Sequence, residues 1–157
     1  MKLLLIRHAT ADDRSLGLAD HTRQLTDKGR QQSRRLAAFL AGSGLHADVL
    51  LCSTLCRAQQ TAQILHQHLS WPQPEAVDWL DIDSEAEAQQ QAIARYTEQK
   101  GLELLVCVGH EPDISALLAS YLGSEASCFQ IKKASASLLD LTGRQACLLW
   151  SLPVALM

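Results

Sequence analysis

Residues 2–8 read KLLLIRH, a short apolar run that ends abruptly at an arginine and a histidine. A run of this length without polar alternation is typical of a strand buried on both faces of a parallel sheet. Similar runs occupy Asp48–Cys52, which precedes a serine, and Leu102–Val108, which precedes a glycine and a histidine. We therefore expect three buried strands of one sheet, each followed by polar residues at its carboxyl end.

Helical signals stand between these runs. Candidate helices begin near Thr26, Ser53, Ser84 and Pro112, each marked by a capping residue or a first-turn proline. In the second of them, apolar residues recur at three- and four-residue steps and predict one buried face. The alternation of strands and helices predicts a parallel sheet that is covered by helices on both faces.

The C-terminal part of the chain has a different pattern. Apolar runs at Cys128–Ile131, Ser137–Leu141 and Ala146–Trp150 predict further strands, and a Thr-Gly pair between the last two predicts an antiparallel hairpin. The expected fold class is therefore α/β: a three-layer α/β/α sandwich with a mostly parallel central sheet and a C-terminal antiparallel hairpin. We expect residues 1–157 to form it as a single domain.

The composition limits what the protein can bind. Its 157 residues are 47% hydrophobic and 20% charged, which is enough apolar material for a core and unlike a disordered tail. The net charge of −3 gives no general attraction to nucleic acid or to an anionic membrane. No apolar run approaches the roughly 20 residues of a membrane helix. The five scattered cysteines favour a reducing compartment, so we expect a cytoplasmic protein without nucleic-acid or membrane partners.

The polar residues at the strand ends indicate the function. Ligands of open α/β sheets bind at the carboxyl ends of the strands. Parallel neighbours would bring together Arg7 and His8 after the first strand, Arg57 one helical turn beyond the second, and His110 after the third. Two guanidinium groups match the oxygens of a phosphoryl group, and a neutral imidazole can accept such a group and release it to water. This set predicts a phosphatase site.

The same residues predict how the site works. Nearby arginine charges lower the pKa of a histidine and so favour its neutral, nucleophilic form. In this scheme His8 is the nucleophile, and His110 donates a hydrogen bond to an equatorial phosphoryl oxygen. Because the arginines already balance the charge of the anion, we expect neither a metal nor another cofactor. Lys132 and Lys133 could border the site, although a solvated sheet edge is the interpretation we favour for them.

Several of these residues have simpler interpretations when each is taken alone. An arginine or histidine after a strand is usually a solvated surface residue. We interpret Ser53 as a helix cap and Thr61 as a hydroxyl that packs within a helix. For Arg23 we expect an ion pair with Asp20 or Asp27, which would stabilise its loop.

Three motifs in these places resemble the signatures of the histidine phosphatase superfamily. Residues 5–9 (LIRHA) resemble its Arg-His-Gly/Ala signature, and residues 53–61 (STLCRAQQT) resemble its Ser-x-x-x-Arg-Ala-x-x-Thr segment. Residues 108–110 (VGH) resemble the segment that carries its second histidine. The motifs occur in the family's order and the resemblance spans nearly the whole chain, so together they are a specific signal.

The resemblance carries expectations about fold and mechanism. It implies a phosphoglycerate mutase-like fold, with His8 as the covalent nucleophile and with Arg7, Arg57 and His110 completing the phosphate pocket. The short chain and residues 23–29 (RQLTDKG) are similar to the small SixA-type branch, which is associated with phosphohistidine in signalling proteins. That branch lacks the insertions with which larger relatives enclose small substrates, and an open site suits a phosphohistidine displayed on a protein.

Relatives that hydrolyse phosphate esters protonate the leaving oxygen with an acidic residue. The matching residues 79–85 (WLDIDSE) reproduce that pattern poorly, although Asp81 or Asp83 could serve as the acid. Departure of an imidazole demands less of a general acid than departure of an alkoxide. The favoured prediction is a metal-independent phosphatase that acts through phospho-His8 on the phosphohistidine of a signalling protein of the histidine-phosphotransfer type.

Two alternatives stay open beside this prediction. A small-molecule phosphomonoesterase of broad specificity would use Asp81 or Asp83 as its acid, and a non-catalytic module would bind a phosphoryl ligand without turnover. The intact His8 speaks against the second, because a sensor needs hydrogen-bond donors but no nucleophile. A mutase is less favoured, since the chain is too short to enclose a sugar phosphate and to keep a phosphoenzyme from water.

Overall fold

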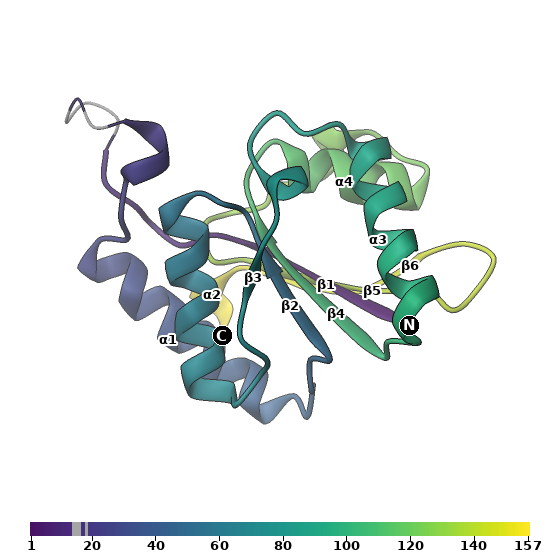
Figure 1. The fold of residues 1–157 in the computed structure, drawn as a ribbon, viewed down its shortest axis with the longest axis horizontal. Helices are drawn as coiled ribbons and strands as arrows, with labels where there is room; N and C mark the ends of the chain where they lie inside the picture. Colours follow the sequence, from purple (N-terminus) through teal and green to yellow (C-terminus); the bar gives the residue numbers. More distant parts are fainter. Residues whose placement is uncertain (14–16, 18) are drawn as a thin grey trace.

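A parallel sheet extended by an antiparallel hairpin forms the centre of the protein (Figure 1). The structure, a computed structural model, describes residues 1–13, 17 and 19–157. The strands are β1 (Lys2–Arg7), β2 (Val49–Cys52), β3 (Glu75–Ala76), β4 (Leu104–Gly109), β5 (Ala136–Asp140) and β6 (Cys147–Leu152). The α-helices are α1 (Asp27–Gly42), α2 (Cys56–Leu69), α3 (Ala86–Lys100) and α4 (Asp113–Leu122). The strand order is β3-β2-β4-β1-β5-β6, with β1 to β4 parallel and β5 and β6 antiparallel to their neighbours.

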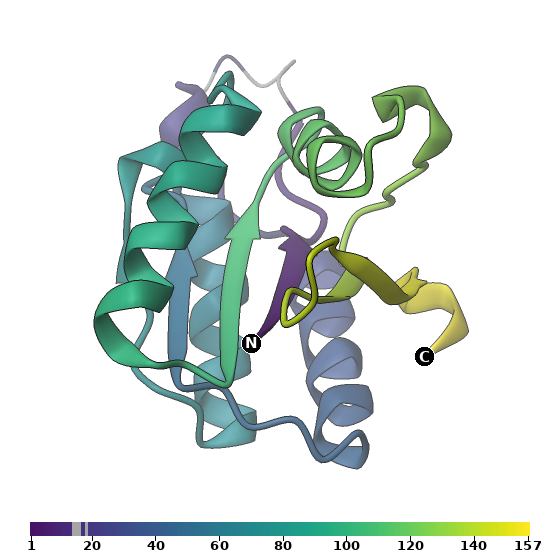
Figure 2. The same cartoon turned by 90° about the vertical axis from the view of Figure 1, so that its right-hand side faces the viewer.

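Helices cover both faces of this sheet (Figures 1 and 2). Helices α1 and α2 lie on one face, and α3 and α4 lie on the other. The side chains of β1 alternate between the two cores. Leu4 and Ile6 pack under α1 and α2, whereas Leu3 and Leu5 pack under α3 and α4. The predicted three-layer α/β/α sandwich with a mostly parallel sheet and a C-terminal hairpin is confirmed.

The predicted caps are right for one helix and wrong for another. Thr26 caps α1, where its hydroxyl oxygen accepts a hydrogen bond from Gly29 N at 3.1 Å. Ser53 does not cap α2, because this helix begins at Cys56 and its N-cap position is Leu55. None of the helices in the described part of the chain combines the length and the apolarity that crossing a bilayer requires.

One predicted strand does not form. Within Cys128–Ile131, the first residue ends a short 3₁₀ helix, Ala126–Cys128, and the others belong to no strand. The place beside β1 is already taken by β4 on one side and β5 on the other. Ile131 is buried instead in the core under α3 and α4, and its carbonyl oxygen accepts a hydrogen bond from Arg7 Nη1 at 2.6 Å. The apolar residues of this segment therefore reflect a packed loop.

Strand register places the ends of three strands at one edge of the sheet. In the β1–β4 pair, Arg7 lies opposite Gly109, and in the β2–β4 pair, Cys52 lies opposite Val108. The pairing continues past β1, because His8 N donates to the carbonyl oxygen of Gly109 at 3.0 Å. The polar residues that follow these strands must therefore lie close together.

The loop after β1 is held against the first turn of α1. Thr10 N donates to Gln32 Oε1 at 3.0 Å, and the carbonyl oxygen of Thr10 accepts from Thr26 N at 3.1 Å. Gly29 permits this approach, because a Cβ atom at its position would lie 1.9 Å from the Thr10 carbonyl oxygen. The position of the Thr10 backbone, two residues beyond His8, therefore requires a glycine at position 29 of α1.

We predict that Gly29→Ala destabilises the protein. The added methyl group meets backbone rather than a flexible side chain, so the free energy of unfolding should fall by about 1–3 kcal/mol, as in an overpacked core. Gly42→Ala in the same helix is the matched control, because its Cβ would meet open space. Urea unfolding followed by circular dichroism measures the free energy of unfolding of both variants. Equal values for Gly29→Ala and Gly42→Ala would contradict the close packing of Gly29 against Thr10.

Candidate active site

The structure brings His8, Arg57 and His110 together at the carboxyl edge of the sheet. The rings of His8 and His110 have centroids 4.9 Å apart and are tilted by 54°. Arg57, in the first turn of α2, donates from Nε to His8 Nε2 at 3.3 Å. Arg57 and His110 are each 1% exposed and His8 is 6% exposed. Residues from three distant parts of the chain therefore form one buried cluster.

The hydrogen bonds of His8 identify its reactive nitrogen. Its Nδ1 lies 2.7 Å from the carbonyl oxygen of Ala9, which can only accept, so Nδ1 carries the ring proton. Nε2 then holds the lone pair, which receives the hydrogen bond from Arg57. Burial, followed by the charges of His110 and Arg57, lowers the pKa of His8 to about 3. His8 is therefore a neutral imidazole at neutral pH, and its lone pair on Nε2 is held by the hydrogen bond from Arg57.

The buried guanidinium of Arg57 is neutralised by Asp20. Its Nη2 lies 2.9 Å from Asp20 Oδ2, and its Nη1 donates to the backbone oxygen of Asp20 at 2.8 Å. The other carboxylate oxygen of Asp20 accepts from Arg23 Nη2 at 2.8 Å. The predicted ion pair of Arg23 is therefore confirmed, with Asp20 as its partner. The sequence did not reveal that the same carboxylate also contacts Arg57.

Two further cations face this cluster. Arg7 is half-buried and donates from Nη1 to Ile131, and burial lowers its pKa while the charge of Glu111 acts in the opposite direction. Burial and the charges of Arg7, Arg23 and Arg57 lower the pKa of Lys133. Lys133 therefore borders the site, and the solvated position that we predicted for it is wrong. Lys132 is exposed, as we predicted. Two neutral imidazoles and four cations together form a suitable place for an anion; the cations are Arg7, Arg23, Arg57 and Lys133.

The two acid candidates occupy different environments. Both carboxylate oxygens of Asp81 accept hydrogen bonds: Oδ1 from Ser53 Oγ at 2.6 Å and from Thr54 N at 2.7 Å, and Oδ2 from Thr54 Oγ1 at 2.6 Å. The side chain of Asp83 is exposed, and its backbone N–H donates to Asp113 Oδ2 at 3.1 Å. Only Asp81 is connected to the histidine cluster, and the connection runs through Ser53.

Ser53 belongs to the site, which the sequence analysis missed. It is fully buried, and its Oγ lies 2.8 Å from His110 Nε2. Its place directly after β2, which pairs in parallel with β4, was the available signal. By contrast Thr61 has the packing role that we predicted, because its hydroxyl donates to Arg57 O and accepts from Ala9 N.

Two carboxyl groups that follow His110 were also missed. Burial raises the pKa of Glu111, whose Oε2 accepts from Ser115 Oγ at 2.7 Å. Burial likewise raises the pKa of Asp113 to about 6, although a hydrogen bond from Asp83 acts in the opposite direction. Through its hydrogen bond with the backbone N–H of Asp83, Asp113 tethers the loop that carries Asp81 to the first turn of α4. The sequence offered no pattern that linked these positions.

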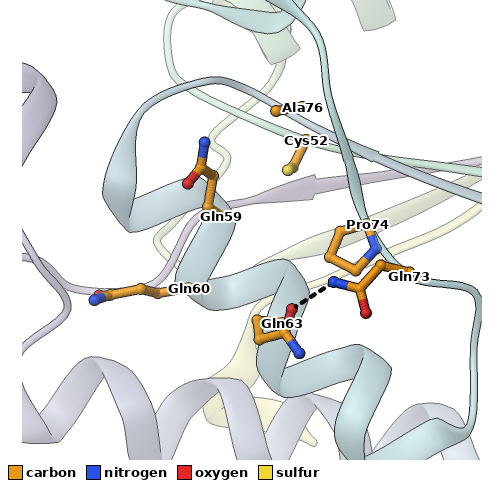
Figure 3. Close-up of a pocket in the computed structure, with 7 residues that line it drawn as sticks. All are labelled: Cys52, Gln59, Gln60, Gln63, Gln73, Pro74 and Ala76. Atoms are coloured by element: carbon orange, nitrogen blue, oxygen red, sulfur yellow. Dashed lines mark hydrogen bonds between the residues drawn. The ribbon is translucent and has the colours of Figure 1, made fainter.

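Other features of the described chain are separate from this cluster. No group of three or more potential metal ligands occurs among the residues that the structure covers. A hollow of about 380 Å³ lies between α2 and β3 and is lined by Gln59, Gln60, Gln63 and Gln73 (Figure 3). Its lining includes Cys52 but none of the histidines or arginines described above. This hollow therefore differs from the anion site.

The model of the histidine phosphatase superfamily (branch 1) matches residues 3–84, which is more than half of the chain. The chain belongs to this superfamily. An uncharacterized protein of Picosynechococcus sp. is 35% identical over 114 residues, which cover 73% of this chain and 68% of that protein. The chain also matches mitochondrial serine/threonine-protein phosphatases Pgam5 of Drosophila species, but it spans only about a quarter of their length.

Solved structures of two phosphatases share the whole fold. The protein histidine phosphatase SixA complexed with tungstate superposes with a TM-score of 0.89 at 21% identity, covering 99% of this chain and 98% of that one. A phosphoserine phosphatase of Entamoeba histolytica, in complex with phosphoserine, superposes with a TM-score of 0.79 at 18% identity, covering 98% and 97%. The predicted enzyme class, a phosphatase with a SixA-like fold, is confirmed.

We predict that the stability of the protein falls as the pH is lowered. Burial holds the pKa values of His8 and His110 in the folded protein at about 3 and about 4, against roughly 6.5 in an unfolded chain. Below 6.5 the unfolded chain binds more protons, so each histidine should lower the free energy of unfolding by up to about 1.4 kcal/mol per pH unit. Urea unfolding from pH 7 to pH 5 measures the slope.

His8→Gln and His110→Gln should each reduce that slope by up to about 1.4 kcal/mol per pH unit, which is more than half of the total because burial raises the pKa of Asp113 to about 6 and gives this group the opposite slope. The exposed His46→Gln is the control and should leave the slope intact. A slope that is unchanged in both buried variants would show that these histidines are not held neutral by the fold.

Proposed function

We propose that residues 1–157 form one histidine phosphatase domain that hydrolyses phosphohistidine on a cytoplasmic signalling protein. The observation that carries this proposal is the hydrogen bonding of His8, whose Nδ1 lies 2.7 Å from the carbonyl oxygen of Ala9. Its Nε2 holds a lone pair, lies beside the guanidinium of Arg57, and belongs to a ring whose pKa is about 3. A buried, neutral and oriented imidazole surrounded by cations suits transfer of a phosphoryl group.

The first step is an in-line transfer. The lone pair of His8 Nε2 leaves its hydrogen bond with Arg57 and attacks phosphorus. The bond from phosphorus to the leaving nitrogen of the substrate breaks, with its electron pair staying on that nitrogen. Arg7, Arg57 and Lys133 stabilise the charge on the phosphoryl oxygens, so this step is proposed to proceed without a metal ion. As the ring of His8 becomes positively charged, its Nδ1–H bond to the Ala9 carbonyl oxygen strengthens.

The second step releases the phosphoryl group. Water attacks phosphorus, the bond to Nε2 of His8 breaks, and the electron pair returns to Nε2. The ring of His110, tilted by 54° with its centroid 4.9 Å from that of His8, places a second imidazole beside the reacting group. Inorganic phosphate then leaves the free enzyme.

The environment of Asp81 supports a phosphohistidine substrate. An ester leaving group needs a proton on its oxygen, but both oxygens of Asp81 already accept hydrogen bonds from Ser53 and Thr54. A leaving imidazole needs less assistance. The fold shared with a SixA protein histidine phosphatase points the same way. The fold shared with a phosphoserine phosphatase supports the alternative, a small-molecule phosphomonoesterase.

A phosphorylated histidine-phosphotransfer domain, labelled with ³²P, tests this proposal. We expect the wild type to release phosphate and to carry transient label that is stable in alkali and labile in acid. His8→Ala should reduce release to background, because no nucleophile remains. His66→Ala is the control, since its ring contacts the Trp71 carbonyl oxygen at the far end of α2.

Other outcomes of the same experiment separate the alternatives. Equal rates on p-nitrophenyl phosphate would favour the phosphomonoesterase. Binding of the labelled domain without any phosphate release would favour the non-catalytic module. Wild-type turnover by His8→Ala would exclude the phospho-His8 route altogether.

A further inference from the structure

A chain of hydrogen bonds runs from Asp81 through Ser53 to His110. Ser53 Oγ lies 2.6 Å from Asp81 Oδ1 and 2.8 Å from His110 Nε2. Leu55 N also donates to Ser53 Oγ, at 3.1 Å. Ser53 and His110 are at most 1% exposed, so water does not compete for these bonds. The chain joins the ends of β2 and β4 to the loop that follows β3.

The direction of these bonds follows from the capacity of a hydroxyl group. A serine hydroxyl has one hydrogen to donate and two lone pairs that accept. Asp81 Oδ1 is a carboxylate oxygen, so the hydrogen of Ser53 points to Asp81. One lone pair of Ser53 receives the Leu55 N–H, and the other must receive a hydrogen from His110. His110 Nε2 therefore carries the ring proton.

This assignment leaves the lone pair of His110 on Nδ1. That atom is buried and has no hydrogen-bond partner among the described residues. Burial and the charge of Arg57 hold the pKa of His110 at about 4, so the ring is neutral at pH 7. Neutral His110 thus offers an acceptor, and the donor role that we expected from the sequence requires Nδ1 to take up a proton first.

We propose that Asp81 and Ser53 are positioning residues, which fix the tautomer of His110 so that Nδ1 accepts a proton from the water that attacks phospho-His8. The inference rests on the proposed function. In the step, the water oxygen bonds to phosphorus while one of its protons moves to His110 Nδ1. The phosphorus–Nε2 bond breaks, and its electron pair returns to His8. His110 later gives its proton to the departing phosphate or to solvent.

The charges around His110 fit this role. Asp81 and Asp20 raise its pKa and so stabilise the imidazolium that forms in the step, whereas Arg57 and Arg7 lower it. The neutral ring of His8 faces it from the end of β1. Asp81 acts on a nitrogen it does not touch, through the hydroxyl of Ser53. It is thereby an orienting carboxylate and has no need to be the acid for a leaving group.

The first test is the tautomer of the resting protein, which requires no turnover. In ¹⁵N-labelled wild type at pH 7, we expect the chemical shifts of His110 to show a protonated Nε2 and an unprotonated Nδ1. Ser53→Ala and Asp81→Ala remove the acceptor or its anchor, so each should shift the population toward the Nδ1–H form. Asp81→Asn can keep its carbonyl oxygen toward Ser53 and should preserve the tautomer. A protonated Nδ1 in the wild type would overturn the proposal.

The second test is the rate of phosphoenzyme hydrolysis in a single turnover. Ser53→Ala and Asp81→Ala should slow it roughly 100-fold, the lower range for a positioned proton acceptor. In Asp81→Asn the acid limb of the pH–rate profile should move to lower pH than in the wild type, because the charge that raises the pKa of His110 is gone. A purely structural role would leave that limb in place.

Ser33→Ala is the matched control. Ser33 is a fully buried serine whose hydroxyl donates to the Gly29 carbonyl oxygen in α1, away from His110. It should change neither the tautomer nor the hydrolysis rate. Wild-type hydrolysis by Ser53→Ala and Asp81→Ala would contradict the proposal. Should the wild type form no phosphoenzyme, the proposed function fails, while the tautomer measurement still decides whether Ser53 and Asp81 orient His110.

Discussion

The buried guanidinium of Arg57 is the constraint on which the rest of the site depends. A side chain that always carries a charge lies here in the interior with 1% of its surface exposed. Removing an ion from water costs several kcal/mol unless partners satisfy it, so the fold must surround this group with acceptors. Asp20 supplies a carboxylate and a backbone oxygen, and His8 supplies a ring lone pair. The loop between β1 and α1 is therefore tied to the first turn of α2.

Burial and that charge together hold the two histidines neutral. Burial is the largest cause of their lowered pKa values, and a second cation beside Arg57 would also be repelled in a region that water does not screen. Neutral imidazole has one donor and one acceptor, and the fold specifies which nitrogen has which role. A carbonyl oxygen selects Nδ1–H in His8, and a serine hydroxyl selects Nε2–H in His110. Adjacent rings thus present lone pairs on different nitrogens.

The sequence could predict the sheet and the residues at its strand ends, because both depend on local patterns. Apolar runs identify buried strands, and parallel pairing forces the residues after them to one edge, which is why His8, Arg57 and His110 were found. Ser53 carried the same signal, because it directly follows β2, but the contacts of Ser53 with His110 and of Asp20 with Arg57 could not be predicted in this way. Each acts through a hydrogen bond to a residue at least 37 positions away, and neither has a periodic signature. The prediction of a strand at Cys128–Ile131 was wrong for a related reason. The sequence of a packed apolar loop resembles that of a strand until the neighbours of β1 are known.

The charge of the site differs in sign from the charge of the chain. The net charge of the chain is −3. Three arginines nevertheless lie close enough to Lys133 to lower its pKa further than burial alone does: Arg7, Arg23 and Arg57. Asp20 neutralises part of this cluster and so keeps the site stable without a ligand. A phosphoryl group bound as proposed would meet Arg7 and Arg57, whose positions are already held by protein partners. The attraction is local and short in range, so it favours a single phosphoryl group over any extended polyanion.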